Sequence, residues 1–190
     1  LRQGGNSYFA LDVTNPNNPQ HLFTFAYYPV TEMVSYWDAN GNVTNYNAAS
    51  GSIPSQYDYT NLGEAWSIPQ IIKIKINSID KWVAVFGGGY NNQIAGHGSN
   101  LFIIDMENNG EIINKLTVAS NNNGIVNSVP PSVTVINADS SSAFSDAGAL
   151  IYFSDLEGKL WKVSLLNDNT MYSMTKIFDA QSLTSNGRLS

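Results

Sequence analysis

The feature that most constrains the fold of this chain is an internal repeat of about sixty residues. Residues 63–69 (GEAWSIP) and 124–130 (GIVNSVP) share the pattern G-x-x-x-S-x-P, and alternating β-branched residues follow each copy. Three further apolar segments come next in both copies, separated by turns rich in Gly and Asn. Four short strands per repeat are typical of a β-propeller blade. The repeat therefore predicts complete blades over about 63–119 and 124–180.

The clearest single element is residues 149–166 (ALIYFSDLEGKLWKVSLL), where two apolar runs flank a short polar break at 155–158. Aromatic and β-branched side chains suit a half-buried pleated surface, and Gly158 can adopt the positive φ of a tight turn. This pattern predicts a β-hairpin. Because an isolated hairpin is marginally stable in water, it must pack against neighbouring sheets.

The N-terminal part of the chain carries only half of the pattern. Residues 7–13 (SYFALDV) and 21–28 (HLFTFAYY) match the third and fourth strands of the repeat, without a first and second strand before them. The fold class expected is all-β, a partial β-propeller of about two complete four-stranded blades plus half a blade, cut from a larger propeller. The predicted organisation is a half blade at 1–28, an inserted loop region at 29–61, blades at 62–120 and 121–182, and the start of a further blade at 183–190.

The inserted region at 29–61 is rich in Tyr, Asn and Gly and fits no strand of the repeat. Insertions in repeat folds usually form loops on one face, and these are often binding loops. A surface loop packed by its own aromatic side chains explains the composition equally well. Both interpretations stay open; the aromatic residues concerned are Tyr36, Trp37, Tyr46, Tyr57 and Tyr59.

Composition excludes several classes of protein. The formal net charge is -6 and Lys and Arg do not cluster, which argues against a nucleic-acid partner. The chain has no cysteine, so disulfides and thiolate metal sites are excluded. The apolar runs are too short for a transmembrane helix. The chain starts at Leu1 without a signal peptide, which indicates a piece of a longer protein.

Taken in order, several segments resemble the C-terminal β-propeller domain of the PilY1/PilC family of type IV pilus biogenesis factors and tip adhesins. They are residues 8–14 (YFALDVT), 62–69 (LGEAWSIP), 81–92 (KWVAVFGGGYNN), 101–105 (LFIID) and 152–162 (YFSDLEGKLWK). The resemblance implies a non-enzymatic segment that supports pilus assembly and attachment, located outside the cell at the bacterial outer membrane and pilus tip. The partners it implies are minor pilins or the pilus tip, a host-cell or abiotic surface, and the remaining blades of the parent propeller.

The resemblance also implies calcium as a possible cofactor, held in an acidic loop before the hairpin. In this chain the loop corresponds to residues 139–149, and its candidate calcium ligands are Asp139, Ser141 and Asp146. Calcium prefers several oxygen ligands at alternating positions, closed by a carboxylate. Ala143 and Ala149 supply no side-chain oxygen at two of these positions. The residues therefore favour a structural strand connection over a calcium site.

The remaining motifs do not indicate catalysis. Gly87, Gly88 and Gly89 follow a predicted strand but open no helix, so close backbone approach is favoured over a phosphate loop. His21 and His97 are isolated and lack a second ligand at metal-binding spacing. Two other hypotheses stay open beside the pilus protein: a quinoprotein-like propeller enzyme, and a purely structural propeller piece with no binding site of its own.

Overall fold

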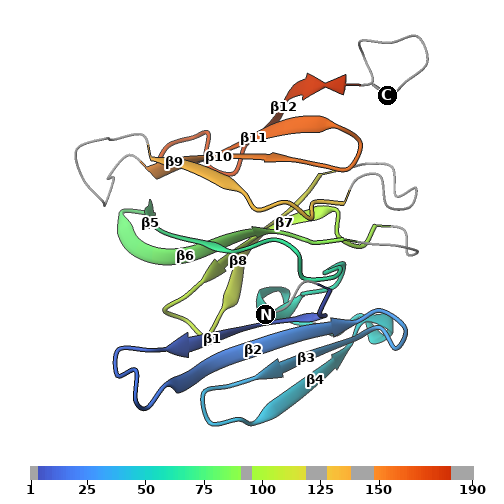
Figure 1. The fold of residues 1–190 in the computed structure, drawn as a ribbon, viewed down its shortest axis with the longest axis vertical. Coiled ribbons are helices and arrows are strands. Elements are labelled where there is room, and N and C mark those ends of the chain that lie inside the picture. The colour runs from blue at the N-terminus through green and yellow to red at the C-terminus, as the bar shows by residue number, and fades with distance from the viewer. Residues whose placement is uncertain (1–3, 91–95, 119–127, 138–147, 181–190) are drawn as a thin grey trace.

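The structure is a computed structural model that describes residues 4–90, 96–118, 128–137 and 148–180. Within these ranges the chain forms three antiparallel sheets of four strands each. Figure 1 shows the sheets stacked one upon the next, with β1–β4 at one end, β5–β8 in the middle and β9–β12 at the other end. We call them the first, second and third sheets. The prediction of an all-β chain is confirmed.

The second and third sheets contain the strands predicted from the repeat. Their order follows the sequence, so each strand pairs with its neighbour along the chain, as in a meander. The predicted hairpin is confirmed, since Ala149 pairs with Leu165, Phe153 pairs with Trp161, and the turn glycine Gly158 has a φ of +77°. The strands are β5 (Gln70–Ile76), β6 (Ile79–Gly87), β7 (Asn100–Asp105), β8 (Glu111–Thr117), β9 (Thr134–Asn137), β10 (Gly148–Ser154), β11 (Lys159–Leu166) and β12 (Met174–Asp179).

The first sheet differs from expectation. It has four strands instead of two, so the expectation of a loop throughout residues 29–61 was wrong. Ser35 donates a hydrogen bond to Asn45 across the added strands, which gives this Asn-rich stretch a role in the sheet. Asn has low strand propensity, and Asn45 and Asn47 concealed the strand over residues 43–47. The strands of the first sheet are β1 (Ser7–Asp12), β2 (Gln20–Tyr28), β3 (Met33–Trp37) and β4 (Val43–Asn47).

The hairpin of β1 and β2 is the counterpart of β7–β8 and β11–β12. All three strand pairs contain a register shift, located between Ala10 and Leu11 in the first sheet and between Ile103 and Ile104 in the second. Among the described strand pairs no other has such a shift. In β1 and β7 the shift lies near the turn that follows the strand, whereas in β11 it lies between Leu160 and Trp161, near the start of the strand. A β-bulge at the same place in the first two sheets is a specific structural feature, and it indicates that β1 and β2 occupy the third and fourth positions of a blade.

Two isolated bridges between sheets support this equivalence. Gly5, just before β1, pairs with Ala65 before β5, and Gly89, in the connection between β6 and β7, pairs with Val129 before β9. In both cases a segment that leads to the third-strand position of one sheet contacts the segment that precedes the first strand of the next sheet. It follows that β3 and β4 extend the first sheet beyond its fourth-strand position, and that β1 has no partner on its other edge within the described residues.

The glycine triplet allows the sheets to approach closely, as predicted. A Cβ atom on Gly87 would lie 2.2 Å from the carbonyl oxygen of Val129, and one on Gly89 would lie 2.0 Å from that of Glu64. Gly89 also has a φ of +94°, which side-chain-bearing residues rarely adopt. No larger residue fits at these two positions without moving the backbone.

The rest of residues 29–61 contains two short 3-10 helices, η1 (Ala48–Ser50) and η2 (Ser55–Tyr57). After η2 the chain passes beside β8 and continues into β5. Among the described residues no helix has the length and apolar character needed to cross a membrane.

Candidate functional site: a cleft beside the inserted segment

The inserted segment, residues 29–61, forms most of a cleft with a volume of about 390 Å³. This volume lies in the range of small-ligand sites. Of the described residues that line it, all but Tyr27 on β2 and His97 in the connection between β6 and β7 belong to the inserted segment. The lining residues are Tyr27, Glu32, Ala48, Gly51, Ile53, Asp58, Thr60, Asn61 and His97. We call it the insert cleft.

Local hydrogen bonds shape the wall of the cleft that includes η1. The side-chain oxygen of Asn47 accepts a hydrogen bond from the backbone N–H of Ala49, which caps the helix. Gly51 ends it in the left-handed conformation, with a φ of +66°. The N–H of Ala48 donates to the carbonyl oxygen of Glu32, so this wall is joined to the turn between β2 and β3.

Tyr59 anchors the returning part of the inserted segment. Its side chain is fully buried, and its ring stacks on Phe25 of β2 with the ring centroids 3.7 Å apart. The hydroxyl donates a hydrogen bond to the carbonyl oxygen of Gly110 in the β7–β8 turn. Burial raises the pKa of Tyr59 well above its ordinary value, so the hydroxyl stays protonated and continues to donate.

Lys115 on β8 fixes the residues that follow η2. Its Nζ lies 2.6 Å from Oδ2 of Asp58 and 3.0 Å from the carbonyl oxygen of Asp58, and it also contacts Thr60. Burial opposes ionisation of Asp58, but hydrogen bonds from Lys115 and Thr60 hold the pKa of this carboxyl below its ordinary value. Asp58 therefore carries a negative charge at neutral pH, and Lys115 compensates it.

Tyr27 and His97 form the inner part of the cleft. Their rings lie 5.3 Å apart at an angle of 55°, and both residues are buried. Burial lowers the pKa of His97, against a weaker opposing effect of the Glu32 carboxylate, so the ring is neutral at neutral pH. Burial, with the Glu32 and Asp58 carboxylates in addition, raises the pKa of Tyr27.

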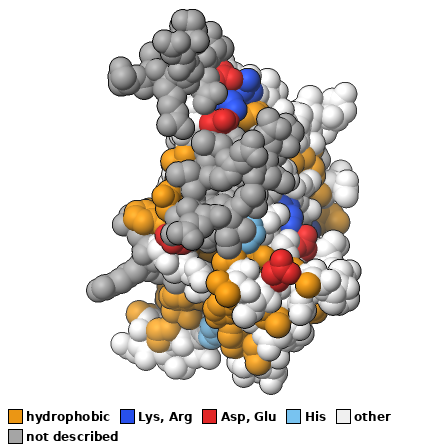
Figure 2. All heavy atoms as spheres, turned by 90° about the vertical axis from the view of Figure 1, so that its right-hand side faces the viewer, with side chains coloured by type: hydrophobic (Ala, Val, Ile, Leu, Met, Phe, Trp, Pro, Cys, Tyr) orange, Lys and Arg blue, Asp and Glu red, His pale blue; other side chains and the backbone are white. Residues whose placement is uncertain are grey.

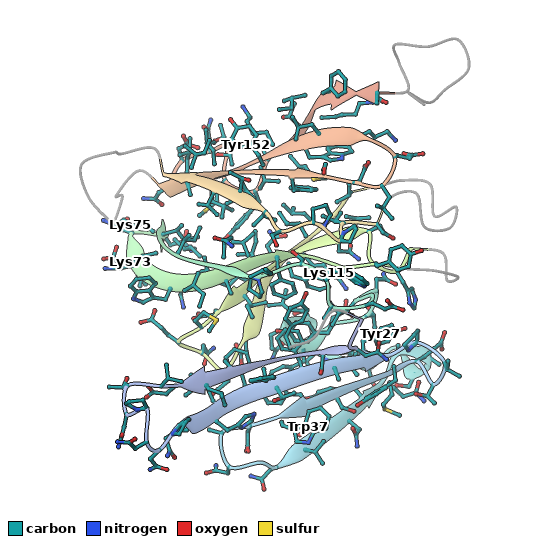
Figure 3. All side chains as sticks on the ribbon, in the orientation of Figure 1. Tyr27, Trp37, Lys73, Lys75, Lys115 and Tyr152 are labelled. Atoms are coloured by element: carbon teal, nitrogen blue, oxygen red, sulfur yellow. The ribbon has the colours of Figure 1, made fainter. Side chains whose placement is uncertain are left out.

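The figures place this cleft at one end of the sheets. Figure 3 shows Tyr27 at the right-hand end of the first sheet and Lys115 in the sheet above it. Figure 2 shows that end of the molecule facing the viewer, with few charged side chains among many hydrophobic and uncharged ones.

The calcium ligands predicted from the sequence, Asp139, Ser141 and Asp146, lie outside the described residues. In the described part of the chain no group of three or more His, Asp and Glu side chains is placed to hold a metal ion. His21 shares a hydrogen bond of 2.8 Å between its Nε2 and the hydroxyl of Thr24 on the same strand. The calcium loop stays a prediction.

Sequence reasoning located the inserted segment but missed Tyr27, His97 and Lys115 as parts of one site. These residues are far apart in the sequence and belong to a strand, a connection and a strand of the next sheet. The available signal in the sequence was weak: an isolated histidine in a Gly-rich connection at 96–98. Only the stacking of the sheets brings these residues together.

Comparison with known families decides the relationship of the chain. A family model described as the PilY1 beta-propeller domain matches residues 1–188. The chain belongs to this family. It is therefore part of a β-propeller domain of a type IV pilus-related protein, and its three four-stranded sheets are consistent with a partial propeller. The predicted resemblance and fold class are confirmed. Curated proteins and solved structures gave no match to the chain.

Proposed function

We propose that this PilY1 propeller segment is a non-enzymatic part of a type IV pilus biogenesis factor and adhesin. It supports pilus assembly and attachment to host cells or abiotic surfaces, outside the cell at the outer membrane and pilus tip. The observation that carries the proposal is the family match over residues 1–188, supported by the stacked four-stranded sheets. Minor pilins or the pilus tip are the protein partners in this proposal.

The remaining blades of the parent propeller are the other partner, and the exposed face of the first sheet supports this part. Phe9 and Leu11 on β1 are 47% and 43% exposed. Their counterparts across the shared bulge, Phe102 and Ile104, are 0% and 3% exposed because the first sheet covers them. Exposed aromatic and aliphatic side chains at positions that are buried in the next blade indicate a docking face for a preceding blade.

The inserted segment adds β3 and β4 to the outer edge of the first sheet, which we call the rim, and we propose that partners contact the propeller there. Val43 on the added strand β4 is 50% exposed and lies in the same cross-strand row as Phe9, through Trp37 and Thr24. A preceding blade that has only the four repeat strands covers Phe9 but leaves Val43 in solvent. A substitution of Phe9 therefore tests the docking face, and a substitution of Val43 tests the rim.

The test is complementation of a strain of a pilus-bearing bacterium that lacks the parent gene. We expect this strain to lose surface pili, counted by electron microscopy, and attachment, measured on glass and on cultured cells. The full-length wild-type gene restores both. We expect the F9D variant to fail because a charge is introduced into the docking face, and the V43D variant to restore both.

Two results would contradict the proposal. Normal piliation and attachment in the deletion strain would remove the pilus role. Full activity of F9D, with protein levels equal to V43D on an immunoblot, would leave the pilus role intact and remove blade docking at this face.

A further inference from the structure

Strand β1 lies at the edge of the first sheet and directs backbone hydrogen-bonding groups away from it (Figure 1). The N–H of Tyr27 donates to the carbonyl oxygen of Asn6 over 3.1 Å, so the bonds from this strand to β2 fall at every second residue from Asn6 onward. The backbone groups of Ser7 and Phe9 therefore point away from β2. The carbonyl oxygen of Gly5 points the same way, and there it accepts a backbone hydrogen bond from the segment before β5. Among the described strands, none pairs with this edge of β1.

Part of the second sheet is uncovered on the face that meets the first sheet. Ala84 on β6 is buried between these two sheets, whereas Ile71, which pairs with it from β5, is 59% exposed. Trp82, two residues before Ala84 and on the same face, is 37% exposed. The corresponding face of the third sheet is covered, since Val133 before β9 is 4% exposed and Ile151 on β10 is 0% exposed. The first and second strand positions are thus covered in the third blade and exposed in the second blade.

Packing places the open edge of β1 beside this uncovered face. The ring of Tyr8 on β1 packs on Phe86 of β6, with the ring centroids 4.7 Å apart. On β2, Phe25 stacks on Tyr59, whose ring lies 5.8 Å from that of Phe102 on β7. The order β1, β2 therefore follows the order β6, β7 in the sheet below it, and the open edge of β1 lies on the side of β5. The uncovered face continues the interface that the first and second sheets already share.

The chemistry of the uncovered face favours an apolar cover. Lys73 pairs with Trp82 across β5 and β6, and its Nζ lies 2.8 Å from Oδ2 of Asp80. Because Asp80 compensates this charge, the face requires no counter-ion from outside. It offers a partner the apolar surface of Ile71 and Trp82, beside the backbone donors and acceptors of β1. A β-strand with one apolar face matches both features.

We propose that a β-hairpin of the parent protein pairs with the open edge of β1 and covers Ile71 and Trp82. The hairpin fills the first and second positions of the first blade, so that β3 and β4 become its fifth and sixth strands. The same two positions are filled by β5 and β6 in the second blade and by β9 and β10 in the third. This inference rests on the part of the proposed function that makes the chain a segment of a larger propeller, and it does not depend on the pilus role.

The first experiment compares amide hydrogen exchange in this chain and in the purified full-length parent, by mass spectrometry with electron-transfer fragmentation. The amide of Phe9 points at the open edge, so we expect it to exchange at least about tenfold more slowly in the parent, where the hairpin accepts its hydrogen bond. The amides of Tyr8 and Ala10 point at β2 and are the internal control. We expect them to exchange slowly in both proteins.

The second experiment uses the matched cysteine variants I71C and V30C, because the chain has no cysteine of its own. Val30, in the turn after β2, is 92% exposed. We expect a maleimide to label I71C at least about tenfold more slowly in the parent than in this chain, and to label V30C equally fast in both. Both side chains are exposed in this chain, so neither substitution disturbs its core.

Three results would overturn the proposal. Equally fast exchange of the Phe9 amide in both proteins would show that no strand pairs with β1. Equally fast labelling of I71C would show that the face stays uncovered in the parent. Protection that appears only after a second protein is added would assign the strand to a separate partner. These measurements use purified protein without pili, so a failed complementation test together with protection in the parent would remove the pilus role alone.

Discussion

The two interfaces between the stacked sheets have the same arrangement but bury different kinds of apolar side chain. The interface between the first and second sheets is aromatic, whereas the interface between the second and third sheets is almost entirely aliphatic. Fully or nearly fully buried members of the first are Phe23, Phe25, Tyr59, Phe86 and Phe102, and of the second Val83, Val85, Ile103, Ile151, Val163 and Leu165.

The difference comes from the inserted segment. It adds Tyr36, Tyr57 and Tyr59 to the first interface, and their hydroxyls reach polar groups of the β7–β8 turn region. Tyr36 donates to the carbonyl oxygen of Asn109 over 3.1 Å, and burial raises the pKa of Tyr36 to about 12. Aromatic residues combine a large apolar area with a polar tip. The core of the first interface is therefore tied together by directional bonds from buried tyrosines. In the second interface the core is aliphatic, and the hydrogen bonds come from the segments that precede β5 and β9, such as Ser67 to the carbonyl oxygen of Pro131.

The largest expected effect is that of replacing Tyr59 by Ala. The substitution removes a buried ring and leaves the Gly110 carbonyl oxygen without its donor, so we expect a loss of about 3–5 kcal/mol in the free energy of unfolding. Leu165→Ala in the aliphatic interface is the matched control, with about 2–5 kcal/mol. Urea unfolding followed by tryptophan fluorescence measures both. Amide shifts of Asn61 should change in Y59A and stay unchanged in L165A; unchanged shifts in both would contradict the anchoring role of Tyr59.

A smaller effect is expected for Tyr59→Phe, which keeps the ring stack on Phe25 and removes only the hydroxyl. The lost hydrogen bond and the unpaired carbonyl oxygen should reduce the free energy of unfolding by about 1–2 kcal/mol. Tyr57→Phe is the control, because Tyr57 is only partly buried and its hydroxyl bonds to the Glu111 carboxylate over 3.1 Å. If Y57F cost as much as Y59F, burial of the hydroxyl would not be the cause.

The smallest effect concerns pH. The pKa of Asp58 is lowered in the folded chain, so its stabilising contribution is complete above the unfolded-state pKa of about 3.9 and is lost as the pH falls through the lower folded value. Asp58→Asn should therefore reduce the pH dependence of the urea midpoint between about pH 5 and pH 3. Asp168→Asn, in the turn after β11, removes a carboxyl whose pKa is lowered by hydrogen bonds from Thr170 alone. If D58N and D168N differ in the pH dependence of the urea midpoint, and this difference disappears when both are made in the K115M background, the effect of Asp58 is due to Lys115.

Most of the fold follows from the sequence. Alternating apolar residues and glycine turns predicted β5–β8 and the β10–β11 hairpin, because strand periodicity and turn chemistry are local properties. The same reasoning failed at Val43–Asn47, which has one partly buried side chain at Tyr46 and owes its strand conformation to pairing with β3. The predicted blade boundaries at 62–120 and 121–182 stay predictions, and residues 183–190 lie outside the described ranges.

By itself, the sequence determined that the chain is all-β, that its units repeat, and which family it belongs to, since each of these is written in local periodicity and ordered motifs. Tertiary structure alone decided that the inserted segment becomes the rim of a four-stranded sheet and encloses a cleft with Tyr27 and His97. The physical reason is that strand pairing and the stacking of sheets join residues that are distant along the chain. No local pattern encodes which aromatic ring, carboxylate and lysine will then share one site.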